Sequence, residues 1–225
     1  MPVKNPYISI NRLAEYATTS SSLRRRNIIK NLKEDKEFIA QRYSEVYNIM
    51  SPYFKSNCEE NFFDPTIAKI NAKTITSKWD KDDFRNSILA LESLNQIAYP
   101  DFSNYDVLST LTPKLDSISW NGVKVSIKPD VYLKHKKTNK VGAVKLNISK
   151  TTDSRLDDER REYVTAAMKY VFLDKGLVLA EIDNKACISL EAFGKEYSIA
   201  PAAYVNKIRH LQVSCQEIAD RWDSV

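Results

Sequence analysis

The sequence predicts an α+β fold in which a small central mixed β-sheet is flanked by helices and preceded by a helical N-terminal part. Apolar residues recur at helical spacing toward both ends of the chain, and they alternate every second residue between about residues 117 and 148. The chain has 225 residues, 43% of them hydrophobic, which suffices to bury a full core. We therefore expect a helical region over residues 1–76 and an α/β core with a C-terminal helix over residues 77–225.

The N-terminal region is expected to contain two short helices with polar caps. Ser9 or Asn11 caps the first helix, and a serine at position 21 or 22 caps the second. The second helix opens with three cations, which are Arg24, Arg25 and Arg26. Cations are unfavourable at the positive end of the helix dipole. Two interpretations stay open: the arginines contact phosphates, or they reach solvent and acidic neighbours within the protein.

Two further helices are predicted before the strands begin. The apolar spacing from Phe38 through Ile39 to Met50 indicates a helix that Pro52 ends, and an irregular connection follows. Asp80 then caps the next helix, which ends near residue 98. This helix carries Glu92 on the shoulder of its apolar stripe. A glutamate in that position either leans toward a site at the end of a sheet or stays at the surface.

Alternating apolar residues predict a run of strands in the middle of the chain. Asn121-Gly122 is a dipeptide typical of two-residue hairpin turns, because both positions tolerate a positive φ. Pro129 cannot donate a ladder hydrogen bond, so we expect an irregularity over residues 128–130. After a basic turn, a strand is predicted over residues 141–148. One face of it carries Ala143, Lys145 and Asn147.

The last third of the chain is expected to contain a helix, a strand hairpin and a long final helix. The first helix ends at Gly176, and residues 177–182 then pair back with residues 186–190 as two strands. The final helix has a narrow apolar stripe that includes Ile208 and Leu211. That stripe is either a packing face or a coiled-coil seam, which would form a homo-oligomer or hold a partner protein.

Composition excludes several classes of function. Three widely spaced cysteines without a C-x-x-C pair favour neither a disulfide framework nor a zinc site. Two histidines leave little material for a Ser-His-Asp or Cys-His site, and the usual glycine-rich phosphate loops are missing from the sequence. The sequence has no apolar run of membrane-spanning length and opens with no leader pattern, so we expect a cytoplasmic protein. The net charge of +5 permits nucleic-acid binding.

The order of these elements resembles the PD-(D/E)xK nuclease superfamily. Pro129-Asp130 matches the PD step of that family, Lys145 matches its lysine, and a helix carrying Glu92 precedes them. The resemblance covers about residues 80–190 and implies a restriction-endonuclease-like core. It also implies that Asp130 and Glu92 bind Mg²⁺ or Mn²⁺ and that Lys145 orients the attacking water.

One position departs from the family pattern, because Ala143 stands where the second acid is expected. A single aspartate binds Mg²⁺ weakly. Three explanations stay open: an acid has been replaced in this sequence, an acid from elsewhere in the chain takes its role, or the fold is kept only for binding. The acids available for the second explanation are Glu92, Asp116, Glu162 and Glu181.

The function favoured by the sequence is a nuclease-like DNA-binding protein, which is a metal-dependent phosphodiesterase of bacterial defence or DNA processing if the site is active. DNA is expected in preference to RNA. The phosphates of the DNA would contact the basic turn and the arginine row, which consists of Arg24, Arg25 and Arg26. The basic turn contains Lys136, Lys137 and Lys140. The alternative is an inactive interaction or assembly subunit that uses the nuclease-like fold as a binding scaffold.

Overall fold

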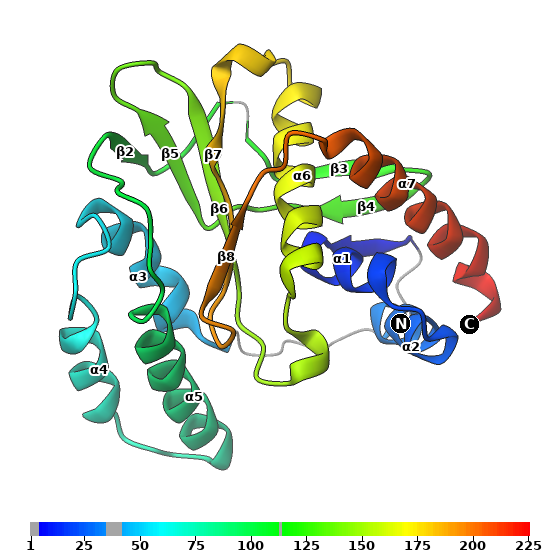
Figure 1. Ribbon diagram of the computed structural model, residues 1–225. Helices are drawn as coiled ribbons and strands as arrows, with labels where there is room; N and C mark the ends of the chain where they lie inside the picture. The colour runs from blue at the N-terminus through cyan, green and yellow to red at the C-terminus, as the bar shows by residue number, and fades with distance from the viewer. Residues whose placement is uncertain (1–4, 35–41, 113) are drawn as a thin grey trace.

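The computed structural model describes residues 5–34, 42–112 and 114–225, and within them it contains two mixed β-sheets and seven α-helices (Figure 1). The predicted α+β class is thus confirmed, with two sheets where the sequence predicted one. The three-stranded sheet has the order β1-β4-β3, with the bounds Tyr7–Ser9, Val123–Ser126 and Ser117–Trp120. The five-stranded sheet has the order β2-β5-β6-β7-β8, with the bounds Tyr105–Leu108, Val131–His135, Val141–Asn147, Ile182–Glu191 and Glu196–Ile199.

The five-stranded sheet contains one parallel pair, β6 and β7, whereas its other neighbouring strands run antiparallel. Parallel neighbours need a crossover connection, which is supplied by α6 (Asp158–Asp174). The carboxyl ends of β6 and β7 therefore lie at the same edge of the sheet, and the chain enters α6 from that edge.

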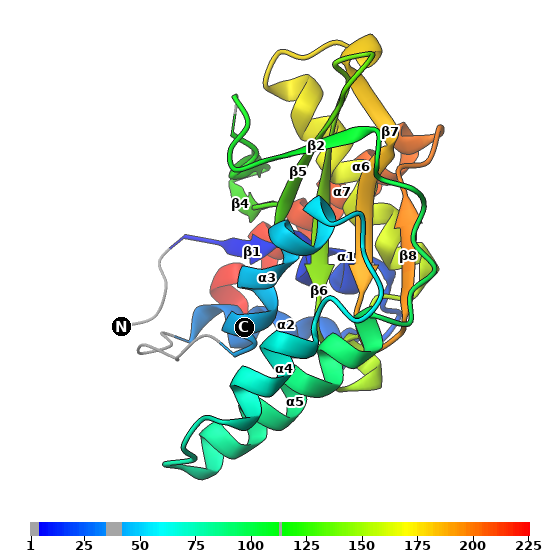
Figure 2. The same cartoon turned by 90° about the vertical axis from the view of Figure 1, so that its left-hand side faces the viewer.

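Helices cover both faces of this sheet (Figure 1, Figure 2). One apolar core joins the face of Ala143 and Cys187 to the three-stranded sheet and to α6. The other helices of that core are α1 (Ile10–Thr18), α2 (Ser22–Lys33) and α7 (Tyr204–Arg221). A second core joins the face of Val144 and Leu146 to α3 (Ser44–Lys55), α4 (Asp64–Asn71) and α5 (Lys78–Leu94). Figure 2 turns these three helices toward the viewer.

Several local predictions are confirmed. Ser9 and Ser21 are the N-caps of α1 and α2, and the side chain of each accepts a backbone hydrogen bond from three residues ahead. The Asn121-Gly122 turn joins β3 to β4 with φ values of 49° and 77°. Lys128 has a φ of 36°, so the expected irregularity before β5 is present.

Three element predictions are wrong. Pro52 lies inside α3, because a proline in the last turn of a helix removes only one hydrogen bond near the end. The connection predicted after it contains α4, which Pro65 opens near its N-terminus, where a missing N–H is tolerated. Residues 182–191 form one long strand paired with β6, whereas residues 179–181 form a short 3-10 helix. The Asp-Asn-Lys stretch itself is half-buried or exposed and lies within the register shift opposite Gly142, whereas the residues after it are buried and paired with β6.

The predicted helix boundaries shift in two further places. The N-cap of α5 is Ser77, and Asp80 stands three residues inside the helix, where its carboxylate accepts from the Ser77 hydroxyl. Phe38 and Ile39 lie outside the described residues. Elements from residues 1–76 and from residues 77–225 share both cores; β1, for example, pairs with β4.

The apolar stripe of α7 packs inside the molecule. Ile208 is 3% exposed and Leu211 is fully buried, and both belong to the core that contains α1 and α6. The packing-face interpretation of this stripe is therefore the one that holds. The outward side of α7 exposes Val205 and Val213 instead. No helix in the described part of the chain combines the length and the apolar character that a membrane span requires.

Gly142 sets the register between β6 and β7. The pairing steps from Val141 opposite Ile182 to Ala143 opposite Cys187, so β7 carries extra residues at this point. A Cβ atom on Gly142 would lie 2.3 Å from Cβ of Ala186. Close backbone approach at Gly142 therefore aligns the second half of β6 with β7.

Candidate functional site

The centre of the candidate site is a pair of charged side chains, Asp130 and Lys145. Asp130 directly precedes β5, and its backbone N–H donates to the carbonyl of Val144 at 2.8 Å. Its carboxylate lies 3.2 Å from Nζ of Lys145 and accepts a hydrogen bond from the backbone N–H of Leu146 at 2.7 Å. The structure thus brings together the two residues that the sequence analysis singled out.

The ammonium of Lys145 has three oxygen neighbours, which satisfy its three N–H donors. Nζ lies 2.8 Å from the carbonyl oxygen of Lys128 and 3.2 and 3.4 Å from the two carboxylate oxygens of Asp130. The irregular backbone at Lys128 turns this carbonyl toward the site. The ammonium of Lys145 therefore lies among three oxygen atoms, two from Asp130 and one from Lys128.

Burial dominates the electrostatics of Asp130. The side chains of Asp130 and Lys145 are each 15% exposed. Burial raises the pKa of Asp130 above its ordinary value, although the Lys145 ammonium and the Leu146 N–H act in the opposite direction. Burial thus outweighs the opposing effect of Lys145 on the pKa of this carboxyl.

Asn147 extends the polar cluster along β6 toward β7. Its amide donates to a carboxylate oxygen of Glu191, which also accepts from the backbone N–H of Leu156 at 2.8 Å. Asn11 of α1 donates to Oδ1 of Asn147 at 3.1 Å. Glu191 is 1% exposed, burial raises its pKa, and its Oε1 has no hydrogen-bond partner within the described residues. This network fixes α1 and the segment that precedes α6 to the strand ends.

Glu92 does not join the cluster. It is exposed on α5, and among the described residues it makes no hydrogen bond or ion pair with Asp130. The α5 residue that reaches this edge is Asn86, whose Oδ1 accepts from Nζ of Lys150 at 3.1 Å. Six residues separate Asn86 from Glu92, which is about 9 Å along a helix.

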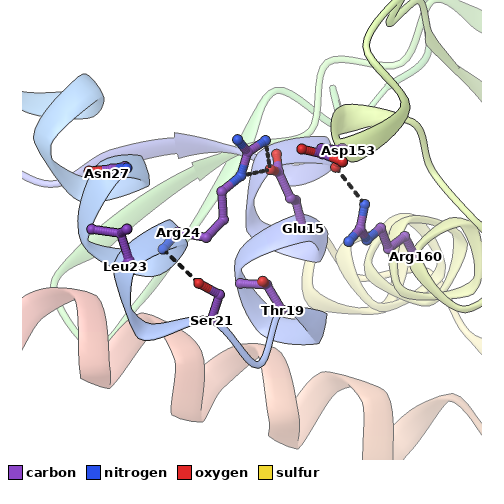
Figure 3. Close-up of a pocket in the computed structure, with 8 residues that line it drawn as sticks. All are labelled: Glu15, Thr19, Ser21, Leu23, Arg24, Asn27, Asp153 and Arg160. Atoms are coloured by element: carbon purple, nitrogen blue, oxygen red, sulfur yellow. Dashed lines mark hydrogen bonds and ion pairs between the residues drawn. The ribbon is translucent and has the colours of Figure 1, made fainter.

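A cavity of about 380 Å³ lies between α1, α2 and the start of α6 (Figure 3). Glu15, which is 3% exposed, accepts from Nε of Arg24 at 2.8 Å and from Nη1 of Arg12 at 2.6 Å. On the opposite side, Nη1 of Arg160 donates to the carbonyl of Asp153 at 2.9 Å. The charges of Arg24 and Arg160 are matched by those of the two acids, so the cavity has no net charge.

The arginine row is largely neutralised from within the protein. Arg24 pairs with Glu15, and Arg25 lies 3.0 Å from Glu217 and over the ring of Tyr16. Arg26 is exposed. The acidic-neighbour interpretation therefore holds for Arg24 and Arg25, and sequence reasoning missed Glu15 because nothing in the spacing of α1 marked it as buried.

The basic turn lies at the other end of β5 and β6. Five residues separate Lys140 from Lys145, which corresponds to about 17 Å along a strand. Nζ of Lys136 donates to the carbonyl of Ser103 at 2.6 Å, while Lys137 is exposed. Lys136, Lys137 and Lys140 are therefore separate from the Asp130 cluster.

The other acids proposed as replacements have different surroundings. Glu162 lies 2.7 Å from Nζ of Lys207, and Glu181 accepts from the N–H of Val178 at 2.8 Å. Asp116 is exposed in the loop before β3. Within the described residues, these three acids make no hydrogen bond or ion pair with the charged pair.

The side-chain oxygens around Asp130 do not form a ligand set that suits Mg²⁺ or Mn²⁺. Ala143 is fully buried between Tyr132 and Cys187 in the sheet, so no carboxylate stands there. Residues 5–34, 42–112 and 114–225 contain no group of three or more His, Cys, Asp and Glu side chains that could hold a metal ion. Both oxygens of Asp130 already have protein donors. These cations prefer several carboxylate or carbonyl oxygens in open positions.

Comparisons with known proteins identify no relative: no protein-family model, curated protein or solved structure matches this chain.

Proposed function

We propose that this chain is a nuclease-derived DNA-binding protein that does not cut DNA. The observation that carries this proposal is the Lys145 ammonium, which lies among the oxygens of Asp130 and Lys128 where a catalytic cation would have to bind. The chain would therefore use the nuclease-like fold as a binding scaffold.

The strand order supports a restriction-endonuclease-like origin. β2, β5 and β6 form an antiparallel run, α6 crosses over, and β7 lies parallel to β6. The Pro-Asp step precedes β5 and the lysine lies in β6, which is the placement that the family resemblance requires. Asp130 and Lys145 thus have the positions that the family pattern requires and contact each other, whereas Ala143 stands in place of the second acid.

DNA is favoured as the partner because the molecule carries a net charge of +5 and has at one end of the sheet Lys134, which makes no ion pair within the described residues. Binding through phosphates needs no metal ion and no base-specific contact. An assembly role is a second candidate, since Val205 and Val213 are exposed on the outward side of α7.

Fluorescence anisotropy with a short labelled DNA duplex tests the proposal. We expect binding that weakens steeply as salt rises from about 50 to 200 mM, because released counterions drive phosphate binding. Binding should be equal in EDTA and in Mn²⁺, and gel analysis of the same samples should recover intact DNA.

The matched control is Asp130→Asn, which should bind DNA as the unmodified protein does. Cleavage that requires Mn²⁺ and disappears in Asp130→Asn would contradict the proposal and restore the enzyme interpretation. Failure to bind any duplex even at low salt would remove DNA as the partner.

A further inference from the structure

A groove of about 690 Å³ lies at the end of the sheet opposite the Asp130 cluster. Two lysines line it, Lys134 of β5 and Lys175 after α6. Its other polar lining includes Thr110, Thr112, Thr138 and Asn139. We propose that this groove binds the sugar-phosphate backbone of the nucleic acid, an inference that rests on the DNA binding proposed above.

The cations of the groove are available, unlike those of the cavity in Figure 3. Within the described residues, Lys134 makes no side-chain hydrogen bond or ion pair, and the carboxylate nearest Lys175 is its chain neighbour Asp174 at 4.0 Å. The one acid that lines the groove, Glu181, caps the N–H of Val178. The residues that line the groove are thus two lysines and one acid, with Asp174 beside Lys175 and Asp106 opposite Lys134 in the β2–β5 pairing.

The basic turn adds cations at the rim. Lys137 and Lys140 flank Thr138 and Asn139, which line the groove. The turn has a fixed shape, since Nδ1 of His135 accepts from the backbone N–H groups of residues 137 and 138, each at 3.2 Å. Lys136 reaches away to the carbonyl of Ser103. Lys137 and Lys140 are therefore the two turn lysines placed to contact a ligand in the groove.

The remaining lining fits a phosphate backbone. Lysine ammonium, threonine hydroxyl and asparagine amide groups are donors that proteins commonly present to phosphate oxygens and sugars. Leu108, Leu111 and Leu177 supply apolar surface between these donors, against which deoxyribose can pack. An acidic peptide would use the same ammonium groups, so the experiment includes it as a competitor.

The test compares two double variants of equal charge change. Lys134→Gln with Lys175→Gln removes both groove cations. Lys78→Gln with Lys81→Gln removes two exposed lysines from the first turn of α5, where cations do not support the helix. Binding of the labelled duplex is measured over a salt series, and circular dichroism verifies that each variant is folded.

We expect the groove variant to reduce the slope of log affinity against log salt by about 2, because each phosphate-contacting lysine contributes about 1. The α5 variant should keep the slope of the unmodified protein. The groove assignment would be overturned, while DNA binding itself stands, if both variants reduced the salt slope equally or if the groove variant left the slope unchanged. Displacement of DNA by poly-aspartate at equal charge concentration would overturn the choice of nucleic acid. An unmodified protein that binds no DNA would overturn the proposed function as well.

Discussion

Replacing Lys145 with methionine is expected to lower the free energy of unfolding by about 2–3 kcal/mol. The side chains of Lys145 and Asp130 are each only 15% exposed, so the substitution leaves a mostly buried carboxylate with one remaining donor, the Leu146 N–H. Urea denaturation followed by circular dichroism measures the change. The methionine keeps the length of the side chain, so lost packing contributes little.

The double variant Asp130→Asn with Lys145→Met is the control for this prediction. An asparagine can still accept from Leu146 but carries no charge, so the double variant should recover at least about 1 kcal/mol of the loss. A Lys145→Met protein within about 0.5 kcal/mol of the unmodified one would contradict the account.

The loss should also depend on pH, with a sign that the raised pKa of Asp130 determines. A carboxyl whose folded pKa is raised stabilises the fold fully below its unfolded pKa, and that contribution declines as pH rises through the folded pKa. Replacing Lys145 removes an ammonium that lowers the pKa of Asp130. The stabilising contribution of the Asp130 carboxyl therefore declines up to a higher pH in the variant. The difference between the two proteins should therefore be small near the unfolded pKa of an aspartate, at about pH 4, and should grow as the pH rises.

The second large effect is expected at Gly142. An alanine Cβ there would lie 2.3 Å from Cβ of Ala186 and 2.5 Å from its backbone carbonyl carbon and oxygen, so the two strands would have to separate. We expect Gly142→Ala to cost about 3 kcal/mol or more, measured by urea denaturation.

Gly176→Ala provides the comparison for this substitution. Gly176 has a φ of +99° and open space around its missing side chain. Its substitution should cost only about 1 kcal/mol, from backbone strain alone. Equal costs for the two substitutions would show that the close approach of Gly142 to β7 does not control the register.

Local signals in the sequence predicted much of the fold. Ser9, Ser21 and the Asn121-Gly122 turn act through their immediate neighbours, so their roles can be read without knowing the tertiary structure. The long strand β7 was missed because its pairing is set by β6, a neighbour reached only through α6. The stripe of α7 was ambiguous for a similar reason, since its period does not reveal what covers it.

The candidate site was predicted in part. The spacing along β5 and β6 is enough to bring Asp130 next to Lys145. Glu191 and Asn11 could not be found in this way, because each reaches Asn147 from an element distant in sequence. Asn147 could have been recognised as part of the site, because it lies two residues after Lys145 on the same face of the strand.

Titration of the protein with Mn²⁺ by isothermal calorimetry distinguishes a DNA-binding protein without a metal site from a metal-dependent nuclease. We expect no saturable heat for the unmodified protein, since the Lys145 ammonium lies among the oxygens of Asp130 and Lys128. The Asp130→Asn variant should give the same result. Stoichiometric Mn²⁺ binding that Asp130→Asn abolishes would contradict the claim.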